Sequence, residues 1–349
     1  MKSCDYLIIG KGLAGSLLTW KLLQAGASVI VLGSEHIPSA SRAAAGLINP
    51  VTGQRLVLQA EAGALLASAM QCYKELTEHF SQTFFHPLPM LRILQSEREV
   101  MALQKREQDE AYQAYLGSLI HDDELQAPLG LVTQFHTGYL DTNALLDALH
   151  TYFREKRLLI QAEFYHDDLQ TNTEGVVWED IQARQIVFCE GWRAMHNPWF
   201  SYLPFQPAKG EILTLHSKDE LPEMILNKGR WLIPLGSGRC RVGASYDRDH
   251  LNEDATSEGA LELQTIPAQL LKHTPHCLLE QHRAGVRPNT LDKQPFIGLH
   301  PEHPQYAIFN GFGSKGSMMI PFYADIMCRH LQKQNPLPAE ADIRRYACA

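Results

Sequence analysis

The stretch YLIIGKGLAG, residues 6–15, decides the fold of this chain. An apolar run leads into three glycines, Gly10, Gly12 and Gly15, and an amphipathic stretch follows over residues 16–25. In such a segment Gly10 allows the sharp turn from strand to helix, Gly12 lets a pyrophosphate come close to the backbone, and Gly15 lets the helix pack closely on the strand. The free N–H groups at the helix start then face an anion. The segment therefore predicts a strand, a glycine turn and a helix that bind the phosphates of a dinucleotide, with an ordinary tight turn as the alternative.

The second predicted strand, residues 28–32, lacks the acidic residue that ordinarily follows it. An Asp or Glu roughly 20 residues beyond the glycines binds the ribose hydroxyls. Here Gly33 stands in that place, followed by Ser34 and Glu35. Either Glu35 reaches round from the loop, or Ser34 and backbone groups bind the ribose with less charge. A nicotinamide enzyme releases its cofactor and depends on this ribose contact for selectivity, whereas a flavin that stays bound makes many other contacts. The missing acidic residue therefore favours a flavin over a nicotinamide cofactor.

Length, composition and charge predict a globular soluble protein with two domains. The chain has 349 residues, of which 45% are hydrophobic, and this is enough to fill two cores. A formal net charge of −8 and the lack of a basic block argue against a general binder of polyanions. The sequence contains no apolar run of about 18 residues and no signal-peptide pattern, so we expect no membrane span and a cytoplasmic location.

The cysteines and histidines do not form a metal-binding pattern. The seven cysteines are odd in number and never occur as C-x-x-C, which predicts reduced and mostly buried thiols. Three of the sixteen histidines lie close together around Cys277, without the H-E-x-x-H or paired C-x-x-C spacing of a zinc site. We therefore predict no metal. The cysteines are Cys4, Cys72, Cys189, Cys240, Cys277, Cys328 and Cys348.

The order of predicted elements indicates a β-rich region inserted into a nucleotide-binding domain. Helical patterns occur at residues 60–80, 96–115, 143–156, 257–271 and 317–331, and strand patterns at 158–164, 185–189, 209–215, 230–234, 240–245 and 307–309. The predicted fold class is α/β, or α+β overall. We assign residues 1–83, 135–205 and 283–349 to the nucleotide-binding domain, and residues 84–134 and 206–282 to a second, substrate-binding domain.

Five segments, taken together in order and spacing, carry a family resemblance. They are the Gly10 turn, SRAAAGL at 41–47, GYLD at 138–141, FCEG at 188–191, and the C-terminal set AGVRP at 284–288, Asp292, PFIG at 295–298 and GFGSKG at 311–316. With them the chain resembles the glycine oxidase/D-amino-acid oxidase (DAO) family of FAD-dependent amine oxidoreductases, nearly from end to end. The resemblance implies FAD, a Rossmann-like FAD-binding domain and an inserted substrate domain built on an antiparallel β-sheet.

Several segments suit a flavin. The small residues at 41–47 let backbone N–H groups lie close to the flat ring and the pyrophosphate, although a tightly packed helix start is the alternative. The loop at 311–316 opens a helix whose positive N-terminal end can stabilise a reduced flavin, with a plain capping turn as the alternative. The resemblance implies that Phe164 lies near the adenine and Gly191 near the cofactor backbone, whereas by sequence alone Phe164 is a strand residue of the core. The predicted cofactor-binding residues are Gly10, Gly12, Leu13, Ala14, Gly15, Ser34, Glu35, Ser41, Arg42, Ala45, Gly46, Leu47, Phe164, Gly191, Arg287, Gly313, Ser314, Lys315, Gly316 and Ser317.

Arg287 is the predicted substrate anchor. A guanidinium holds a carboxylate with two parallel hydrogen bonds, and in the resembled oxidases the matching arginine binds the carboxylate of the amino acid. A structural clamp between Arg287 and Asp292 is the alternative. Trp231 and Tyr246 fall where the family places residues that line the substrate pocket, and each could equally be a core aromatic residue. We therefore predict Arg287, Tyr246 and Trp231 as the catalytic residues.

The resemblance implies oxidation of a small amine or amino acid that carries a carboxylate. The Cα hydride passes to flavin N5 and the imine hydrolyses in water, with no obligatory side-chain base. The electron acceptor stays open, with oxygen as one candidate. The loop Gly313–Gly316 is closer to that of the oxidase half of the bifunctional enzyme that modifies the tRNA wobble uridine. A tRNA carboxymethylaminomethyl oxidase and a flavin-binding redox sensor without turnover are therefore the alternatives.

Overall fold

The computed structural model describes residues 2–333 and 335–346, and contacts divide the chain into two units. Unit 1 comprises Met1–Arg42, Thr142–Ala208 and Val286–Ala349, and unit 2 comprises Ala43–Asp141 and Lys209–Gly285. Contacts thus group residues 43–83 and 135–141 with unit 2, although the sequence assigned them to the nucleotide-binding domain. The assignment of a function to each unit stays a prediction.

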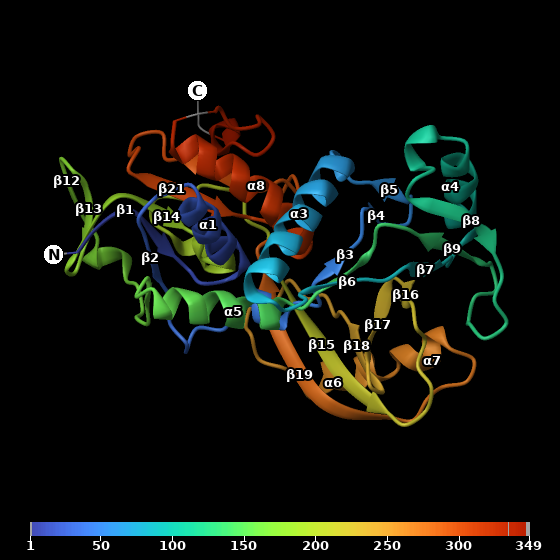
Figure 1. The fold of residues 1–349 in the computed structure, drawn as a ribbon. Helices are drawn as coiled ribbons and strands as arrows, with labels where there is room; N and C mark the ends of the chain where they lie inside the picture. The colour runs from blue at the N-terminus through green and yellow to red at the C-terminus, as the bar shows by residue number, and fades with distance from the viewer. Residues whose placement is uncertain (1, 334, 347–349) are drawn as a thin grey trace. The chain divides into compact units, whose positions relative to one another are not determined.

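Unit 1 is built on an eight-stranded sheet whose centre is parallel (Figure 1). The strand order is β11-β2-β1-β14-β13-β12, and β21 pairs with β14 and with β20. The parallel strands are β11 (Leu159–Ile160), β2 (Val29–Leu32), β1 (Lys2–Ile9), β14 (Ile181–Phe188) and β21 (Tyr306–Asn310). The antiparallel strands are β12 (Gln170–Asn172), β13 (Gly175–Trp178) and β20 (Phe296–Leu299). This sheet confirms the predicted Rossmann-like architecture.

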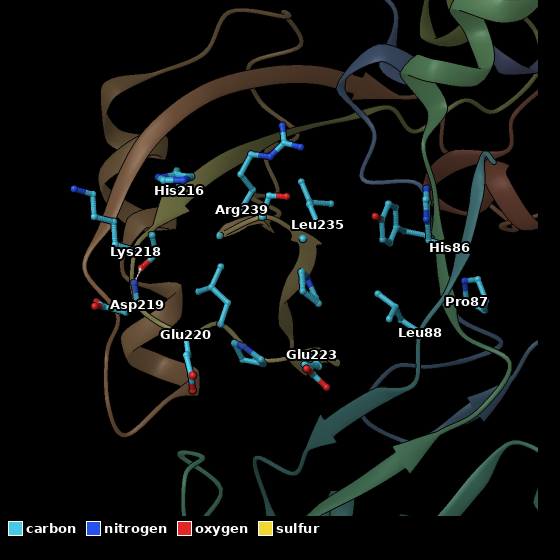
Figure 2. Close-up of a pocket in the computed structure, with 18 residues that line it drawn as sticks. His86, Pro87, Leu88, His216, Lys218, Asp219, Glu220, Glu223, Leu235 and Arg239 are labelled. Carbon is cyan, nitrogen blue, oxygen red and sulfur yellow. Dashed lines mark hydrogen bonds between the residues drawn. The ribbon is translucent and has the colours of Figure 1, made fainter. Parts of the chain in front are cut away.

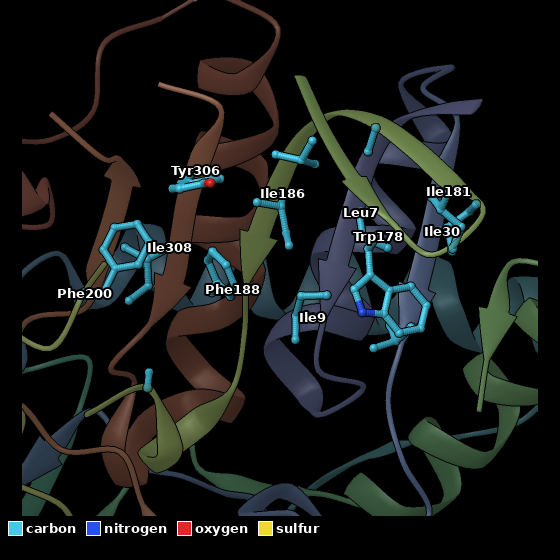
Figure 3. Packing of buried hydrophobic residues seen from close by; sticks show 14 of the residues in the cluster. Leu7, Ile9, Ile30, Trp178, Ile181, Ile186, Phe188, Phe200, Tyr306 and Ile308 are labelled. Carbon is cyan, nitrogen blue, oxygen red and sulfur yellow. The ribbon is translucent and has the colours of Figure 1, made fainter. Parts of the chain in front are cut away.

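Both faces of strand β1 are buried. Because successive side chains of a strand point to opposite faces, Leu7 and Ile9 join a core cluster with Phe188 (Figure 3). Tyr6 lies on the other face, where its hydroxyl donates to the carbonyl of Leu331 at the end of α8. The α-helices of unit 1 are α1 (Leu13–Gln24), α5 (Thr142–Glu155) and α8 (Gly316–Leu331), and the short α2 (Ala40–Ala43) lies at the first boundary between the units.

Unit 2 contains a second eight-stranded sheet, with the order β19-β15-β18-β17-β16-β7-β9-β8. Pairing is antiparallel from β15 to β16 and from β7 to β8, and β16 pairs with β7 in parallel. This largely antiparallel sheet confirms the predicted architecture of the inserted region. The strands are β7 (Met90–Ile93), β8 (Leu116–Ile120), β9 (Leu131–Gln134), β15 (Ala208–Ser217), β16 (Ile225–Lys228), β17 (Arg230–Gly236), β18 (Arg239–Gly243) and β19 (Cys277–Arg287).

The two faces of this sheet carry separate cores. One cluster contains residues of α6 (Ser257–Gln264) and α7 (Ile266–Leu270) together with Leu213, Leu232 and Val242. The opposite face, here called the Trp231 face, carries Ile212, Trp231, Ile233 and Leu235 packed with Ala45, Leu47 and Tyr139. The remaining elements of unit 2 are β3 (Leu47–Ile48), β4 (Val51–Thr52), β5 (Val57–Leu58), α3 (Ala62–Phe80), β6 (Phe85–Pro87), α4 (Glu97–Glu107) and β10 (Gly138–Leu140).

Three predicted elements were too long. The strand expected over residues 158–164 ends at Ile160, because Ile160 pairs with Leu32, the last residue of β2. The helix expected over residues 96–115 ends at Glu107, and a separate short turn begins where the Asp109 carboxylate accepts from the Ala111 N–H. The helix expected over residues 257–271 divides at Thr265 because Pro267, which lacks an N–H, starts a new helix.

The described residues supply no metal-binding group and no bilayer-spanning helix. Among residues 2–333 and 335–346, no three His, Cys, Asp or Glu side chains are placed to hold a metal ion. Within the same ranges every helix is too short or too polar to cross a membrane. Six cysteines are free thiols, five of them buried and Cys277 partly exposed, and Cys348 lies outside the described residues.

Candidate functional site

The glycine turn of unit 1 leaves no room for side chains. Gly10 has a φ of +109°, and a Cβ there would lie 2.3 Å from the carbonyl oxygen of Cys189. A Cβ on Gly15 would lie 1.9 Å from the carbonyl oxygen of Gly10. Both distances are far below van der Waals contact. The strand, the turn and α1 therefore meet as the sequence predicts, and only glycine fits at these two positions.

Hydrogen-bond donors gather at the start of α1. Gly12 precedes the helix without a side-chain cap, and the first turn has no acidic residue. The Leu13 N–H donates to Ser41 Oγ over 3.0 Å, and the hydroxyls of Ser39 and Ser41 would each lie 3.3 Å from a Cβ on Gly12. Backbone N–H groups, two hydroxyls and the positive end of a helix form a donor set that suits a pyrophosphate. The residues present therefore fit a dinucleotide cofactor.

Glu35 is held at the edge where the usual acidic residue is missing. A Cβ on Gly33 would lie 2.8 Å from Lys11 Cγ, so the Lys11 side chain occupies that space. Lys11 Nζ donates to Gln161 Oε1 and Gln161 Nε2 donates to Glu35 Oε1, each over 3.0 Å. Ser34 Oγ accepts instead from the His36 N–H at 3.1 Å. Sequence reasoning missed Gln161, the partner of Glu35. The choice between Glu35 and Ser34 with backbone groups for the ribose stays a prediction.

Arg42 of α2 contacts two residues of α5, Asp147 and His150, and His150 in turn contacts the glycine turn. Its Nη1 lies 2.6 Å from Asp147 Oδ1, and its Nη2 lies 3.4 Å from His150 Nδ1. His150 Nε2 lies 2.8 Å from the carbonyl oxygen of Lys11. Burial lowers the pKa of His150 to about 4. The ring is therefore neutral near pH 7, and we assign the Nε2–H as donor to Lys11 and Nδ1 as acceptor from Arg42.

The predicted flavin run at 41–47 is divided between the units: Ser41 and Arg42 belong to unit 1, and Ala45, Gly46 and Leu47 to unit 2. Gly46 has a φ of +72°, and a Cβ there would lie 1.9 Å from the carbonyl oxygen of Leu140. The Leu140 N–H donates to the Gly46 carbonyl over 2.9 Å. The carbonyl of Ala45 accepts from Arg241 Nη1 over 3.1 Å.

Two asparagines that sequence reasoning missed lie beside the second glycine loop of unit 1. Asn310 Nδ2 donates to the Gly191 carbonyl over 2.8 Å, and a Cβ on Gly313 would lie 2.6 Å from Asn289 Oδ1. A short 3-10 turn, Gly313–Lys315, then leads into α8 at Gly316. Ser314 is exposed and Ser317 is buried. Burial and the neighbouring charge of Lys293 lower the pKa of Lys315. The predicted second loop and helix are therefore present, and their contact with a flavin stays a prediction.

Phe164 lies outside any strand, contrary to its predicted place. It is half-buried, and its ring centroid lies 6.0 Å from that of Phe188 and 6.2 Å from that of Trp178. Beside it, His166 Nε2 is 2.9 Å from Glu190 Oε1. Phe164 therefore packs at the edge of the unit 1 core, and its position near an adenine stays a prediction.

The three predicted catalytic residues belong to different units. Arg287 ends β19 and is partly exposed in unit 1. The Asp292 carboxylate, the partner in the alternative clamp, accepts from Arg345 Nε and from the Tyr346 hydroxyl, each over 2.8 Å. The role of Arg287 stays a prediction.

Trp231 and Tyr246 both lie in unit 2. Trp231 is half-buried and covers Gly243, where a Cβ would lie 2.9 Å from the indole ring. Tyr246 is 58% exposed, and its hydroxyl accepts from Arg248. Tyr246 is therefore not a core aromatic residue, and its part in a substrate pocket stays a prediction.

The chain is similar to known oxidoreductases over almost its whole length. The profile of the DAO family, described as FAD dependent oxidoreductase, matches residues 5–330. A glycine oxidase of Bacillus licheniformis is 24% identical over 353 residues, covering 93% of this chain and 92% of that protein. The bifunctional protein MnmC of Marinobacter nauticus, which is named for tRNA 5-methylaminomethyl-2-thiouridine biosynthesis, is 22% identical over 94% of this chain and 55% of its own length. The crystal structure of a glycine oxidase from Geobacillus kaustophilus has the same fold, with a TM-score of 0.84 at 18% identity, covering 99% of this chain and 98% of that one.

Proposed function

The chain belongs to the DAO family of FAD-dependent oxidoreductases, and we propose that it oxidises the C–N bond of a small amine or amino acid that carries a carboxylate. One observation supports the substrate class most directly. Arg287 stands at the end of β19, and its side chain is partly exposed. A guanidinium so placed suits a substrate carboxylate.

The residues of unit 1 have distinct parts in this proposal. The start of α1 with Ser41 binds the pyrophosphate, and Glu35, held by Gln161, binds the adenosine ribose. FAD, when bound, would supply the hydride acceptor for oxidation of the carbon that bears the nitrogen, and the imine so formed would hydrolyse in water. Arg287 binds the carboxylate in a fixed orientation. Positioning of this kind supplies rate without a side-chain base.

The test is flavin bleaching without oxygen, with a panel of D-amino acids and N-methyl amino acids. We expect the purified protein to be yellow, and at least one carboxylate-bearing amine to bleach it. Replacing Arg287 by Ala removes two charge-assisted hydrogen bonds, so kcat/KM should fall by about 100-fold or more. Arg98→Ala, at an exposed position of α4, is the control. A colourless protein, or an Arg287→Ala variant that bleaches at the original rate, would contradict the proposal.

The similarity to the bifunctional tRNA enzyme supports a second candidate function. The match covers 94% of this chain, although the chain spans only about half of that relative, and the GSKG loop at 313–316 points the same way. The corresponding activity is oxidative removal of a carboxymethyl group from a modified tRNA base. Disappearance of the carboxymethylaminomethyl nucleoside from bulk tRNA, measured by mass spectrometry after incubation with the protein, would favour it. Flavin that bleaches with neither amines nor tRNA would favour a redox sensor.

A further inference from the structure

Three side chains of unit 1 form a hydrogen-bonded bridge over the end of β2. Lys11 comes shortly after β1, Glu35 shortly after β2 and Gln161 directly after β11, and these three strands are parallel neighbours in the sheet. Lys11 Nζ donates to Gln161 Oε1, and Gln161 Nε2 donates to Glu35 Oε1, each over 3.0 Å. This Lys11 bridge therefore lies at the carboxyl ends of the strands, which is the edge where ligands of parallel sheets bind.

The chemistry of the bridge fixes the orientation of its amide group. An ammonium group only donates hydrogen bonds and a carboxylate only accepts them, so the Gln161 oxygen faces Lys11 and the Gln161 nitrogen faces Glu35. Within residues 2–333 and 335–346, Lys11 Nζ has no second acceptor and Glu35 Oε2 has no donor. The bridge thus offers a charged donor and a charged acceptor to a ligand.

Gly33 makes room for the Lys11 side chain. A Cβ on Gly33 would lie 2.8 Å from Lys11 Cγ and 3.1 Å from Lys11 Cδ, so the lysine stem passes where a side chain after β2 would begin. The backbone of Lys11 is held as well, because its carbonyl accepts from the Ser16 hydroxyl over 3.1 Å and lies 2.8 Å from His150 Nε2. An acidic side chain at position 33 and this course of Lys11 therefore exclude each other.

The charges around the bridge are of both signs. Burial lowers the pKa of Lys11, the Glu35 carboxylate opposes this effect, and the guanidinium groups of Arg42 and Arg154 add to it. Arg42 is itself paired with Asp147 over 2.6 Å. A phosphate group at the bridge would face the carboxylate of Glu35. A neutral vicinal diol, in contrast, can accept from Lys11 and donate to Glu35, because each hydroxyl is both a donor and an acceptor.

We propose that Lys11 and Glu35, held together by Gln161, bind the two ribose hydroxyls of the adenosine half of FAD and replace the acidic residue that is missing at Gly33. One hydroxyl accepts from Lys11 Nζ, and the other donates to Glu35 Oε2. The proposal deepens the proposed function and rests on it, because the pyrophosphate is assigned there to the start of α1. It adds Lys11 as a cofactor ligand and Gln161 as the residue that positions both charged groups.

The experiment measures recognition of the ribose hydroxyls. ADP and 2′,3′-dideoxy-ADP compete with FAD for the full chain freed of its flavin, and the ratio of their affinities is determined. Lys11→Met should lower the preference for ADP by about tenfold, because it removes a charge-assisted hydrogen bond to a hydroxyl, and Glu35→Ala should lower it by about as much. Gln161→Leu combined with Lys11→Met should lower it by less than the product of the two separate effects, because both residues act through one bridge.

Two control variants test for effects of charge alone. Arg154→Met removes another cation that acts on Lys11, and it should change the affinities for both nucleotides by the same factor. Arg239→Gln removes a basic side chain from the wall of a cavity of about 850 Å³ in unit 2, which Lys218 also lines (Figure 2). It should leave both affinities unchanged. Binding of 2′,3′-dideoxy-ADP shows in each case that the variant is folded.

The outcomes distinguish this proposal from the proposed function. If Lys11→Met weakens the binding of both nucleotides equally, Lys11 binds a phosphate, and the ribose proposal is overturned while the function stands. A larger fall in the ratio from Ser34→Ala than from Lys11→Met would assign the hydroxyls to Ser34, and a fall from Arg239→Gln would place the nucleotide in unit 2. Either result would also overturn the proposal. If the ratio depends on Lys11 and Glu35 but no amine bleaches the flavin, the proposed function fails and the ribose assignment stands.

Discussion

Gly10 tolerates no side chain, and its replacement tests the turn directly. In Gly10→Ala the new methyl group meets the Cys189 carbonyl oxygen in a backbone conformation that L-residues rarely adopt. We expect the free energy of unfolding to fall by more than about 3 kcal/mol, with loss of bound flavin. Gly26→Ala is the matched control, because Gly26 also has a positive φ, +80°, but open space around it. It should cost about 1 kcal/mol. If urea unfolding showed the same loss of stability for Gly10→Ala and Gly26→Ala, the close contact with the Cys189 carbonyl oxygen would not contribute to it.

His150 makes stability depend on pH. Its pKa is about 4 in the folded protein against an ordinary value of 6.5. Between these values the unfolded chain binds a proton that the folded chain excludes, so stability falls as pH drops from about 6.5 to 4. The loss should reach at most about 3 kcal/mol.

Urea unfolding at several pH values checks this expectation. His150→Gln should lose its share of the pH dependence, because glutamine does not titrate. A variant as sensitive to acid as the original protein would assign the effect to other groups.

The roles of some single residues could be predicted from the sequence, and those of others could not. The glycines of the turn were predictable because their spacing and their flanking strand and helix are local. His150 and Gln161 were not, because each meets Lys11 across more than a hundred residues of chain. Isolated polar residues on a helix or in a loop carry no sign of such a partner.

At the scale of elements, Glu211 joins β15 to α6 and β19. Its carboxylate is 4% exposed, and it accepts from the Thr256 N–H, the Thr256 hydroxyl and His282 Nε2 at 3.0, 2.9 and 2.7 Å. Glu211→Gln turns an amide NH₂ toward one of these donors and leaves it unsatisfied. We expect a loss of about 3 kcal/mol in the free energy of unfolding. Glu258→Gln, at an exposed position of α6, should change it by less than about 0.5 kcal/mol. Similar effects of the two substitutions in urea unfolding would contradict this role.

The types and order of the elements were predictable, and their ends often were not. The strand at 158–164 carried a strand pattern throughout, but its length was set by its neighbour, because β2 ends at Leu32. The prediction of one helix through residue 265 followed the apolar periodicity. Pro267, a local signal in the sequence, interrupts that helix. Strand ends depend on the partner strand, which a pattern of single residues does not contain.

At the scale of the whole molecule, bound FAD should contribute to stability. Because ligand binding favours the folded state, the melting temperature should fall when FAD is removed. The melting temperature should rise again when FAD is added. At an FAD concentration of 100 times the Kd, binding should raise the free energy of unfolding by about 2.7 kcal/mol. Riboflavin lacks the pyrophosphate that we assign to the start of α1, so it should stabilise far less. Equal stabilisation by FAD and riboflavin in thermal unfolding would contradict that assignment.

The division of the chain was the least predictable feature at this scale. Residues 43–83 carry a helix that follows the first strand–helix–strand unit, so sequence order suggested one domain, whereas contacts place them in unit 2. Which segments pack together is decided by long-range contacts that sequence order does not express.

The separation of β1 from its partner strand has a consequence for biosynthesis. Lys2 pairs with Ile181, so a ribosome adding about 5–20 residues per second leaves the β14 side of β1 unpaired for roughly 10 to 40 seconds. Unit 2 has all its residues by Gly285, whereas unit 1 still lacks β20, β21 and α8. Of the two units, unit 1 is therefore the later one to be completed during translation. In the interval the unpaired side of its apolar strand β1 is a target for a nascent-chain chaperone.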